Sequence, residues 1–271
     1  MARKDRKTLV KYFKKGRFPS AVHFEDLIDS MVNKIDDGID KSEGEGLQLA
    51  PQHNAETVIS FFKQLVESQL PEWQVKLKSS NNQNGLSFDR VVPGKDGKAE
   101  SESLFFLDND QRVGIKTLQP RFDLEVNGSL GAKRRIGTYA IGMVDADGEW
   151  HKILTGLDKL QAFEVMAVAK GPPGDGKYAM THALAISTYG KSKNKIRQIK
   201  AHFGRFVWHR YKIELRWSGD IHDYNLEIRT RRHFGADTTH GMSKIKYHIT
   251  SLWDEDSFDE MMFNQDTSEK E

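Results

Sequence analysis

Apolar residues near the start of the chain recur at the spacing of an amphipathic helix. A first short stripe ends at Gly16 and consists of Leu9, Val10, Tyr12 and Phe13. A second stripe follows Pro19 and Ser20 with the i, i+3, i+4, i+7 pattern of one helical face. Its members are Phe24, Leu27, Ile28 and Met31, extended by Val32 and Ile35 until Asp36 to Gly38. We expect this helix to dock through its apolar stripe, within an oligomer, on another protein, or against its own chain's hairpin.

Two further elements complete a predicted N-terminal helical and β-hairpin module, residues 1–91. Asn54 is a suitable N-cap for a third helix that ends at Pro71, with the apolar residues Val58, Ile59, Phe62, Leu65 and Val66. The hydrophobic period then changes to two. Apolar and polar residues alternate on both sides of an Asn-rich turn, which predicts a β-hairpin; the apolar members are Trp73, Val75, Leu77, Leu86 and Phe88.

Residues 92–131 are predicted to form a linker and a short β segment. Positions 92–103 are rich in Gly, Lys, Asp, Glu and Ser, which is typical of an exposed loop. Three short apolar runs follow at 104–107, 112–115 and 122–126, separated by turn residues. Because strands this short bury little surface alone, we expect them to gain stability by association.

Residues 132–253 are almost entirely β by pattern. The clearest strand covers 206–217, where alternate residues from Val207 to Trp217 share one side. Six or seven such strands predict an antiparallel β-sandwich, jelly-roll-like in topology. The final segment, 254–271, has eight acidic residues and one lysine and is expected to be a mobile tail. The predicted fold class is therefore mainly β with an N-terminal α-helical region.

Composition narrows the classes of function. With 271 residues, two domains are expected. The formal net charge of +2 gives no global reason to expect nucleic acid as a partner. The absence of cysteine excludes disulfides, thiol catalysis and cysteine-ligated metal sites. Since no long apolar run is present, we expect no membrane insertion and synthesis in the cytoplasm without a signal peptide.

One segment nearly matches a phosphate-binding loop. Residues 171–177, GPPGDGK, have the spacing of that loop, but Tyr178 stands where a Ser or Thr would bind magnesium. Pro172 and Pro173 have no backbone N–H to offer a phosphate. We therefore expect a turn between two strands.

Candidate catalytic and metal-binding residues are few. Asp220, His222 and Asp223 form the densest cluster of potential ligands, but Gly219 and Asp220 indicate a turn. No two histidines have the i, i+4 spacing of a zinc-binding helix, and no Gly-x-Ser-x-Gly elbow is present. The sequence predicts no enzyme, no metal and no cofactor.

A run of basic residues is the strongest charge feature. Nine lysines and arginines between 191 and 216 stand against Glu214 alone. With Trp208 and Trp217 nearby, an anionic glycan or nucleic acid is one candidate ligand; the predicted contacts include Lys191, Lys193, Lys195, Arg197 and Lys200. The alternative is a solvated sheet face, or one that meets the acidic tail of a neighbouring subunit. We favour this alternative because strands present alternate charges to water.

The sequence VGIKTLQPRFDLEVNGSL, residues 113–130, resembles the VGIGT…P…KLDVNGSV repeat of phage tail fibres and other fibrous bacterial surface proteins. The residues that carry this shaft motif are Val113, Gly114, Ile115, Pro120, Leu124, Val126, Asn127 and Gly128. The resemblance implies a short trimeric β shaft in which apolar residues of three chains meet at an axis. Lys116 departs from the repeat, which has Gly there, so an altered shaft is expected at this residue.

Two flanking regions resemble a narrower group. Residues 11–34 and the block 148–254 are similar to adhesin-like accessory proteins of extracellular contractile injection systems, which are phage-tail-like particles of bacteria. This resemblance implies a non-enzymatic, homotrimeric structural component at the baseplate or in a fibre. Its partners would be other particle proteins, and the assembled particle would be released from the bacterium.

The residue pattern leaves two other functions open. A carbohydrate- or cell-surface-binding adhesin would hold sugars against exposed aromatics such as Trp150, Trp208 and Trp217. A polysaccharide hydrolase needs two carboxylates across a cleft. The sequence cannot pair its candidates, which are Glu149, Glu164, Glu214 and Glu227.

Overall fold

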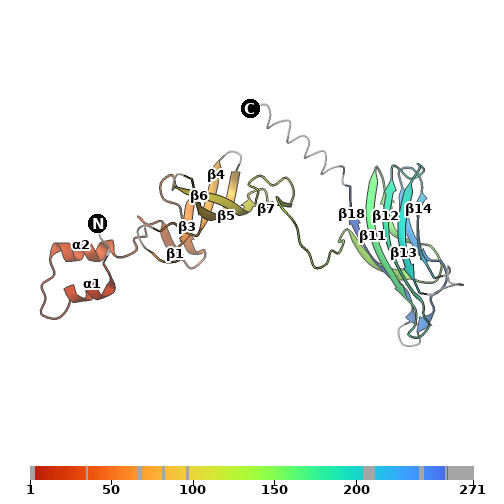
Figure 1. The fold of residues 1–271 in the computed structure, drawn as a ribbon, viewed down its shortest axis with the longest axis horizontal. Coiled ribbons are helices and arrows are strands. Elements are labelled where there is room, and N and C mark those ends of the chain that lie inside the picture. Colours follow the sequence, from red (N-terminus) through yellow and green to blue (C-terminus); the bar gives the residue numbers. More distant parts are fainter. Residues whose placement is uncertain are drawn as a thin grey trace, which may run out of the picture. The chain divides into compact units, whose positions relative to one another are not determined.

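The chain is mainly β and divides into two compact units, an N-terminal unit, Met1–Gly131, and a C-terminal unit, Ala132–Glu271 (Figure 1). In this computed structural model the described residues are 4–34, 36–65, 69–80, 83–95, 98–203, 211–237, 241–253 and 255. The N-terminal α-helical region and the mainly β class are therefore confirmed. The predicted tail, apart from Glu255, lies outside the described residues, as does Trp208.

Two short helices begin the N-terminal unit. α1 spans Arg6–Tyr12, and its N-cap Asp5 accepts a hydrogen bond from the backbone N–H of Thr8 at 3.0 Å. α2 spans Ala21–Asp29, and the two helices meet where Tyr12 stacks on His23 with ring centroids 4.0 Å apart. A longer second helix, through Ile35, was expected.

The second helix ends early because its last turn tightens. The backbone N–H of Ser30 donates to Leu27 O, and that of Met31 donates to Ile28 O, which is i to i−3 bonding. The Ser30 hydroxyl also donates to the Asp26 carbonyl at 2.7 Å, which competes with continuation of the helix. Met31 consequently lies beyond α2, and the predicted docking helix is shorter than its apolar stripe.

The third helix predicted from the sequence is wrong. After the hairpin of β1 (Ile39–Ser42) and β2 (Gly46–Leu49), the chain forms a strand, β3 (Thr57–Phe61). β3 pairs antiparallel with β4 (Trp73–Ser80), with Ile59 opposite Val75. The run Thr57, Val58 and Ile59 is β-branched, and such residues suit a strand that finds a partner.

β3 and β4 belong to a six-stranded sheet in the order β3-β4-β5-β6-β7-β8. The other strands are β5 (Gln83–Pro93), β6 (Ala99–Asp108), β7 (Val113–Ile115) and β8 (Leu124–Val126). The predicted β4–β5 hairpin is confirmed, since Val75 lies opposite Phe88 and Leu77 opposite Leu86.

Most of the predicted linker is strand. Val92 pairs with Glu100 across β5 and β6, so the segment 92–103 is largely the distal part of a hairpin, and the boundary placed after residue 91 falls inside β5. β7 and β8, which contain the shaft motif, extend this same sheet, and they pair parallel to each other. The shaft motif is therefore the edge of the N-terminal unit's sheet within one chain.

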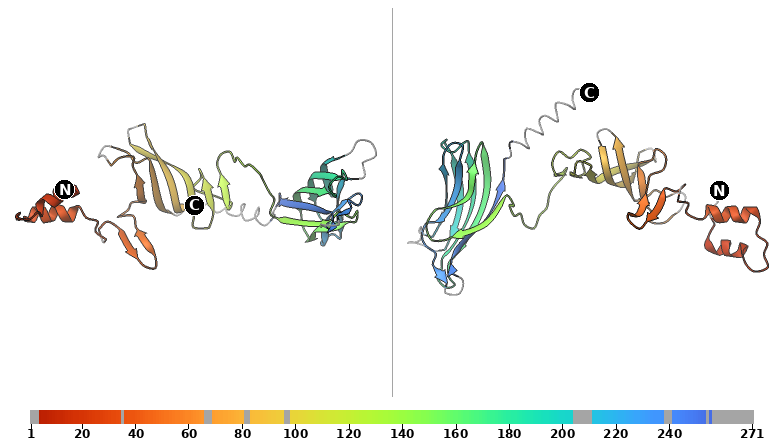
Figure 2. Two further views of the ribbon diagram at one scale, coloured as in Figure 1. Left: turned by 90° about the horizontal axis from the view of Figure 1, so that it is seen from below. Right: turned by 180° about the vertical axis from the view of Figure 1, so that it is seen from behind.

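The C-terminal unit contains two main antiparallel sheets (Figure 2). A five-stranded sheet has the order β13-β12-β11-β18-β9, and a three-stranded sheet has the order β10-β15-β14. Their bounds are β9 Ala140–Asp145, β10 His151–Leu157, β11 Gln161–Lys170, β12 Tyr178–Ser187, β13 Lys195–His202, β14 Ile213–Gly219, β15 Tyr224–Thr230 and β18 Lys244–Ser251. A small hairpin joins β16 (Ala236–Asp237) to β17 (Gly241–Met242).

The two main sheets share one hydrophobic core. Phe163 and Val165 from β11 and Ile249 from β18 meet Leu226 and Ile228 from β15, and all five are fully buried. The alternation predicted for Ile213, Leu215 and Trp217 is present in β14, although this strand begins later than the sequence indicated and residues 204–210 lie outside the described part. The phosphate-loop-like segment is a turn between β11 and β12, closed by Gly171 N–H donating to Lys177 O at 2.8 Å.

Candidate association surface

Strand pairing gathers the apolar residues of the six-stranded sheet on one side. Side chains that face each other across a strand pair point to the same side, and successive residues point to opposite sides. Trp73, Val75 and Leu77 of β4 therefore share a side with Leu86 and Phe88 of β5. The registers carry the same side across all six strands. We call it the apolar sheet face: Ile59, Phe61, Trp73, Val75, Leu77, Leu86, Phe88, Phe105, Leu107, Val113, Ile115, Leu124 and Val126.

The apolar sheet face is open in the single chain. None of its thirteen side chains is classed as buried; Phe61 is 52% exposed, Trp73 43% and Leu124 55%. Phe88 and Phe105 contact each other edge to face, with ring centroids 5.7 Å apart, but both remain partly accessible. Contiguous apolar surface of this kind is typical of a protein–protein interface.

The other side of the same sheet is mostly polar, apart from Phe106, and it is better buried. Lys76 Nζ lies 3.1 Å from Asp89 Oδ2, and the two side chains are 13% and 2% exposed. Lys76 Nζ also donates to the Ser101 hydroxyl at 2.7 Å. An ordinary one-sided antiparallel sheet has the opposite arrangement, with its apolar side buried and its polar side in water. The N-terminal unit is therefore incomplete as a folded layer on its own.

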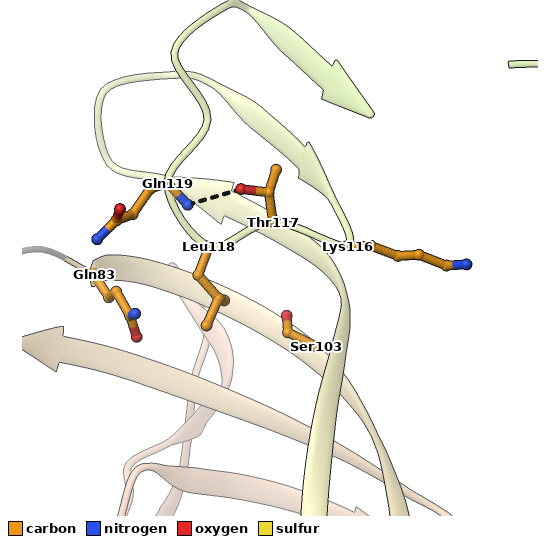
Figure 3. Close-up of a pocket in the computed structure, with 6 residues that line it drawn as sticks. All are labelled: Gln83, Ser103, Lys116, Thr117, Leu118 and Gln119. Atoms are coloured by element: carbon orange, nitrogen blue, oxygen red, sulfur yellow. Dashed lines mark hydrogen bonds between the residues drawn. The ribbon is translucent and has the colours of Figure 1, made fainter. Parts of the chain in front are cut away.

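The loop that follows β7 covers part of this polar side. A Cβ added to Gly114 would lie 2.3 Å from the Thr117 carbonyl oxygen, so only glycine fits beneath the loop. Figure 3 shows the shallow pocket there, lined by Gln83, Ser103, Lys116, Thr117, Leu118 and Gln119, with Leu118 directed into it and Lys116 pointing away. No nucleophile with an adjacent base lines this pocket.

The shaft motif divides between the two sides of the sheet. Val113, Ile115, Leu124 and Val126 contribute to the apolar sheet face. Gly114 and Pro120 are buried, while Asn127 and Gly128 are exposed. The motif thus supplies four of the thirteen apolar side chains at the β8 end of the sheet. The sequence motif indicates these four residues but not their continuity with β3 to β6.

Lys116 adopts a conformation that favours glycine. Its φ is +58°, in the left-handed region, at the position where the tail-fibre repeat has Gly. The Asn127 side-chain amide donates to the Lys116 carbonyl at 3.3 Å, and Asn127 N–H donates to Ile115 O at 2.9 Å. Lys116 therefore keeps the turn at this position. Its left-handed backbone conformation is strained, whereas the glycine of the repeat adopts it readily.

The predicted docking stripe is exposed. Phe24 and Ile28 on α2, and Met31 beyond it, are each half or more exposed, whereas Leu27 is partly buried. Phe24 contacts Phe13 of the segment after α1, with ring centroids 5.4 Å apart. One of the three expectations was that the stripe forms a buried core with the hairpin of its own chain. The exposure of these side chains does not support that expectation.

The basic run does not form one surface. Lys195 and Arg197 lie on the side of β13 away from the core, whereas Lys200 lies on the other side, opposite Thr181. Partial burial lowers the pKa of Lys200, and nearby Glu214 opposes that change. Lys191 pairs with Asp220 at 2.5 Å, while Lys193 is exposed in the turn before β13.

Of the three tryptophans proposed for ligand binding, the structure describes Trp150 and Trp217, and these two do not share one open surface. Trp217 packs toward the core, with its ring centroid 5.6 Å from that of Tyr224 and 6.4 Å from that of Phe163. Trp217 therefore contributes to the core, and its use as a surface contact stays a prediction. Trp150 lies against two guanidinium groups, with Arg216 Cζ 4.2 Å and Arg229 Cζ 4.3 Å from its ring centroid.

Some of the described histidines pair with a carboxylate. His222 Nδ1 lies 2.9 Å from Asp158 Oδ1, and this hydrogen bond holds the pKa of Asp158 below its usual value. His182 Nε2 lies 2.8 Å from Glu164 Oε1. Among the described residues, no group of three or more histidines and carboxylates is placed to hold a metal ion. No described helix is long and apolar enough to span a membrane.

Comparison with known proteins gives only distant similarity. No protein-family model matches the chain, and no curated protein matches it. A tailspike protein of the Acinetobacter baumannii bacteriophage Fri1, a capsular polysaccharide depolymerase, shares 13% identity over 41% of this chain and 18% of its own, with a TM-score of 0.26. The tailspike protein of the Acinetobacter phage vB_ApiP_P1 shares 14% identity over 48% of this chain and 26% of its own, with a TM-score of 0.24. Similarity at this level assigns neither fold nor function.

Proposed function

We propose that this protein is a non-enzymatic structural component of a phage-tail-like contractile injection particle and that it acts as a homotrimer. The observation that carries the proposal is the open apolar sheet face of the N-terminal unit, which includes the apolar residues of the shaft motif. In this view the function is assembly: symmetric copies bury the face and form a baseplate-associated scaffold, cage or fibre.

Association follows from the free energy of apolar burial. Covering a Leu or Phe side chain contributes roughly 1.5–3 kcal/mol when its burial is complete. Thirteen partly exposed apolar side chains therefore supply a large driving force, even after association entropy is subtracted. Three copies related by a threefold axis satisfy such a surface with one repeated contact.

The glycan-binding alternative receives less support. It depended on three tryptophans, of which Trp217 is turned toward the core and Trp208 lies outside the described residues. Trp150 is held by two arginines that also pair with carboxylates, Arg216 with Glu227 and Arg229 with Glu214. This arrangement is sufficiently explained as a charged outer layer on the three-stranded sheet.

Light scattering on a sizing column tests the proposal with the purified full chain. Three chains of 31.0 kDa give an expected mass of 93.0 kDa. Leu124→Asp places a charge on the apolar sheet face and is expected to give monomer. Leu130→Asp is the matched control, because Leu130 is equally apolar and more exposed but lies outside the sheet, and it is expected to remain trimeric.

A monomeric wild-type chain at every accessible concentration would contradict self-association through this face. Particle membership needs a separate measurement, the protein composition of purified particles from cells with and without the gene. Particles that lack this chain, together with unchanged assembly after deletion, would refute the structural role even if the protein trimerises.

A further inference from the structure

A second apolar surface lies on the C-terminal unit. On the side of the five-stranded sheet away from the core, four of the strands, β9, β11, β12 and β13, carry apolar residues that are partly or largely exposed. We call it the outer sheet face: Ile141, Met143, Met166, Val168, Met180, Leu184, Ile186 and Ile199. Figure 1 shows β18, β11, β12 and β13 side by side in this sheet.

The outer sheet face is also basic. Its carboxylates are already paired, Glu164 with Arg135 and His182, and Asp145 with Lys244 at 2.6 Å. Four further cations project on the same side: Lys170, Lys195, Arg197 and Lys246. Among the described residues these four have no carboxylate within salt-bridge distance. The surface therefore combines apolar contacts with an excess of positive charge.

The segment that follows β18 has the complementary chemistry. Residues 254–271 contain eight carboxylate side chains and one lysine. Phe258, Met261 and Met262 have the i, i+3, i+4 spacing of anchors on one helical face. Ser257 and Glu260 have the S-x-x-E spacing of a capping-box sequence.

The chain leaves the sheet beside this surface. Leu252 N–H donates to the Ala162 carbonyl at 2.8 Å, and Ala162 lies opposite Ile186 of the outer sheet face. Twelve residues of the segment would form a helix about 18 Å long, which is shorter than an eight-residue strand such as β18, about 26 Å. The segment can therefore lie along the outer sheet face of its own chain.

We propose that residues 254–271 dock on the outer sheet face of the same chain as an acidic amphipathic segment. Phe258, Met261 and Met262 cover apolar residues of that face, and the carboxylates pair with its unpaired cations. This proposal goes beyond the assembly function and does not depend on trimer formation.

Hydrogen exchange of the full-length protein, followed by mass spectrometry of peptides from 254–271, tests the docking. Backbone amides in the segment are expected to exchange about tenfold more slowly than in the variant Met261→Asp. Ile186→Asp changes only the sheet face and is expected to remove the same protection. Raising the salt concentration from about 0.05 M to about 1 M weakens the ionic contacts and speeds exchange in the wild-type chain.

Two matched variants control for charge and position. Thr267→Asp adds the same charge on the helical side opposite the apolar anchors, and Ile221→Asp makes the sheet-face substitution on a similarly exposed loop residue; both are expected to keep protection. Equal exchange in the wild-type and Met261→Asp chains would overturn the proposal. So would protection that rises with protein concentration, because the segment would then be covered by a second copy.

Discussion

Both units contain strands with alternating apolar residues, but they bury those residues to different extents. In the C-terminal unit eighteen apolar residues are buried in a core between two sheets. In the described part of the N-terminal unit, Phe106 is the one large apolar side chain that is fully buried. The difference lies in layers: the C-terminal unit has two sheets that cover each other, whereas the N-terminal unit has one six-stranded sheet with its apolar side open.

The two units therefore have different requirements for stability. A domain requires at least two packed layers around a core. The C-terminal unit meets that condition within one chain, so it should tolerate changes in oligomeric state. The N-terminal unit should depend on a second layer supplied by other copies.

The largest expected difference between the two units comes from truncating one phenylalanine in each. Phe163→Ala removes a fully buried ring from the C-terminal core and is expected to lower the unfolding free energy of that unit by about 3–5 kcal/mol. Phe61→Ala, on the open apolar sheet face, is expected to cost far less in the single chain. Urea unfolding of both variants, each made in the Leu124→Asp chain that is expected to be monomeric, measures the difference. Equal losses would show that the apolar sheet face is already buried within one chain.

The buried ion pair of the N-terminal unit is the next largest test. Lys76→Met leaves Asp89 buried without its cation and is expected to destabilise the N-terminal unit by roughly 3 kcal/mol. The control Lys34→Met breaks an exposed pair with Asp40 and is expected to cost less than about 1 kcal/mol. Thermal unfolding measures both. If Lys76→Met lowers the unfolding free energy no more than the control does, the polar side of the sheet is hydrated and the Lys76–Asp89 pair is not buried.

The sequence predicts strands well where a period of two is uninterrupted. The β4–β5 hairpin and the alternation in β14 follow from such runs, because one side of each sheet excludes water. The helix expected after Asn54 fails because its apolar residues also suit a strand, and pairing with β4, a tertiary contact, decides between them. The β5–β6 hairpin at 92–103 could not be predicted from its sequence. Its outer part is exposed to solvent, so its residues are polar and resemble a loop.

The candidate surface was only partly predictable. Trp73, Val75 and Leu77 indicate an apolar side of β4, and the shaft motif indicates association of β7 and β8. The run Leu104 to Leu107 does not alternate, however, and a register shift between β5 and β6 determines which of its members join the apolar side. That shift depends on strand pairing, so sequence alone could not show that thirteen residues form one continuous face.

A smaller effect tests how the C-terminal unit is fastened without association. Tyr224 of β15 is fully buried, and its hydroxyl donates to the Lys159 carbonyl at 2.7 Å. Burial also raises the pKa of this phenol. Tyr224→Phe leaves the carbonyl without this donor and is expected to cost about 1–2 kcal/mol, measured by urea unfolding. The mass of the oligomer, measured by light scattering, is expected not to change. A change in this mass would show that the stability of the C-terminal unit depends on association.

The smallest expected effect has the opposite sign and concerns the N-terminal unit. Lys116→Gly places glycine at a φ of +58° and is expected to stabilise that unit by up to about 1 kcal/mol, because a left-handed conformation costs a side-chain-bearing residue more. Gln111→Gly is a matched comparison at a φ of +65° in the β6–β7 turn. Thermal unfolding of the two variants measures the gain. If Lys116→Gly destabilises the assembly while Gln111→Gly does not, the lysine side chain itself makes a contact between copies, and the departure from the tail-fibre repeat serves assembly.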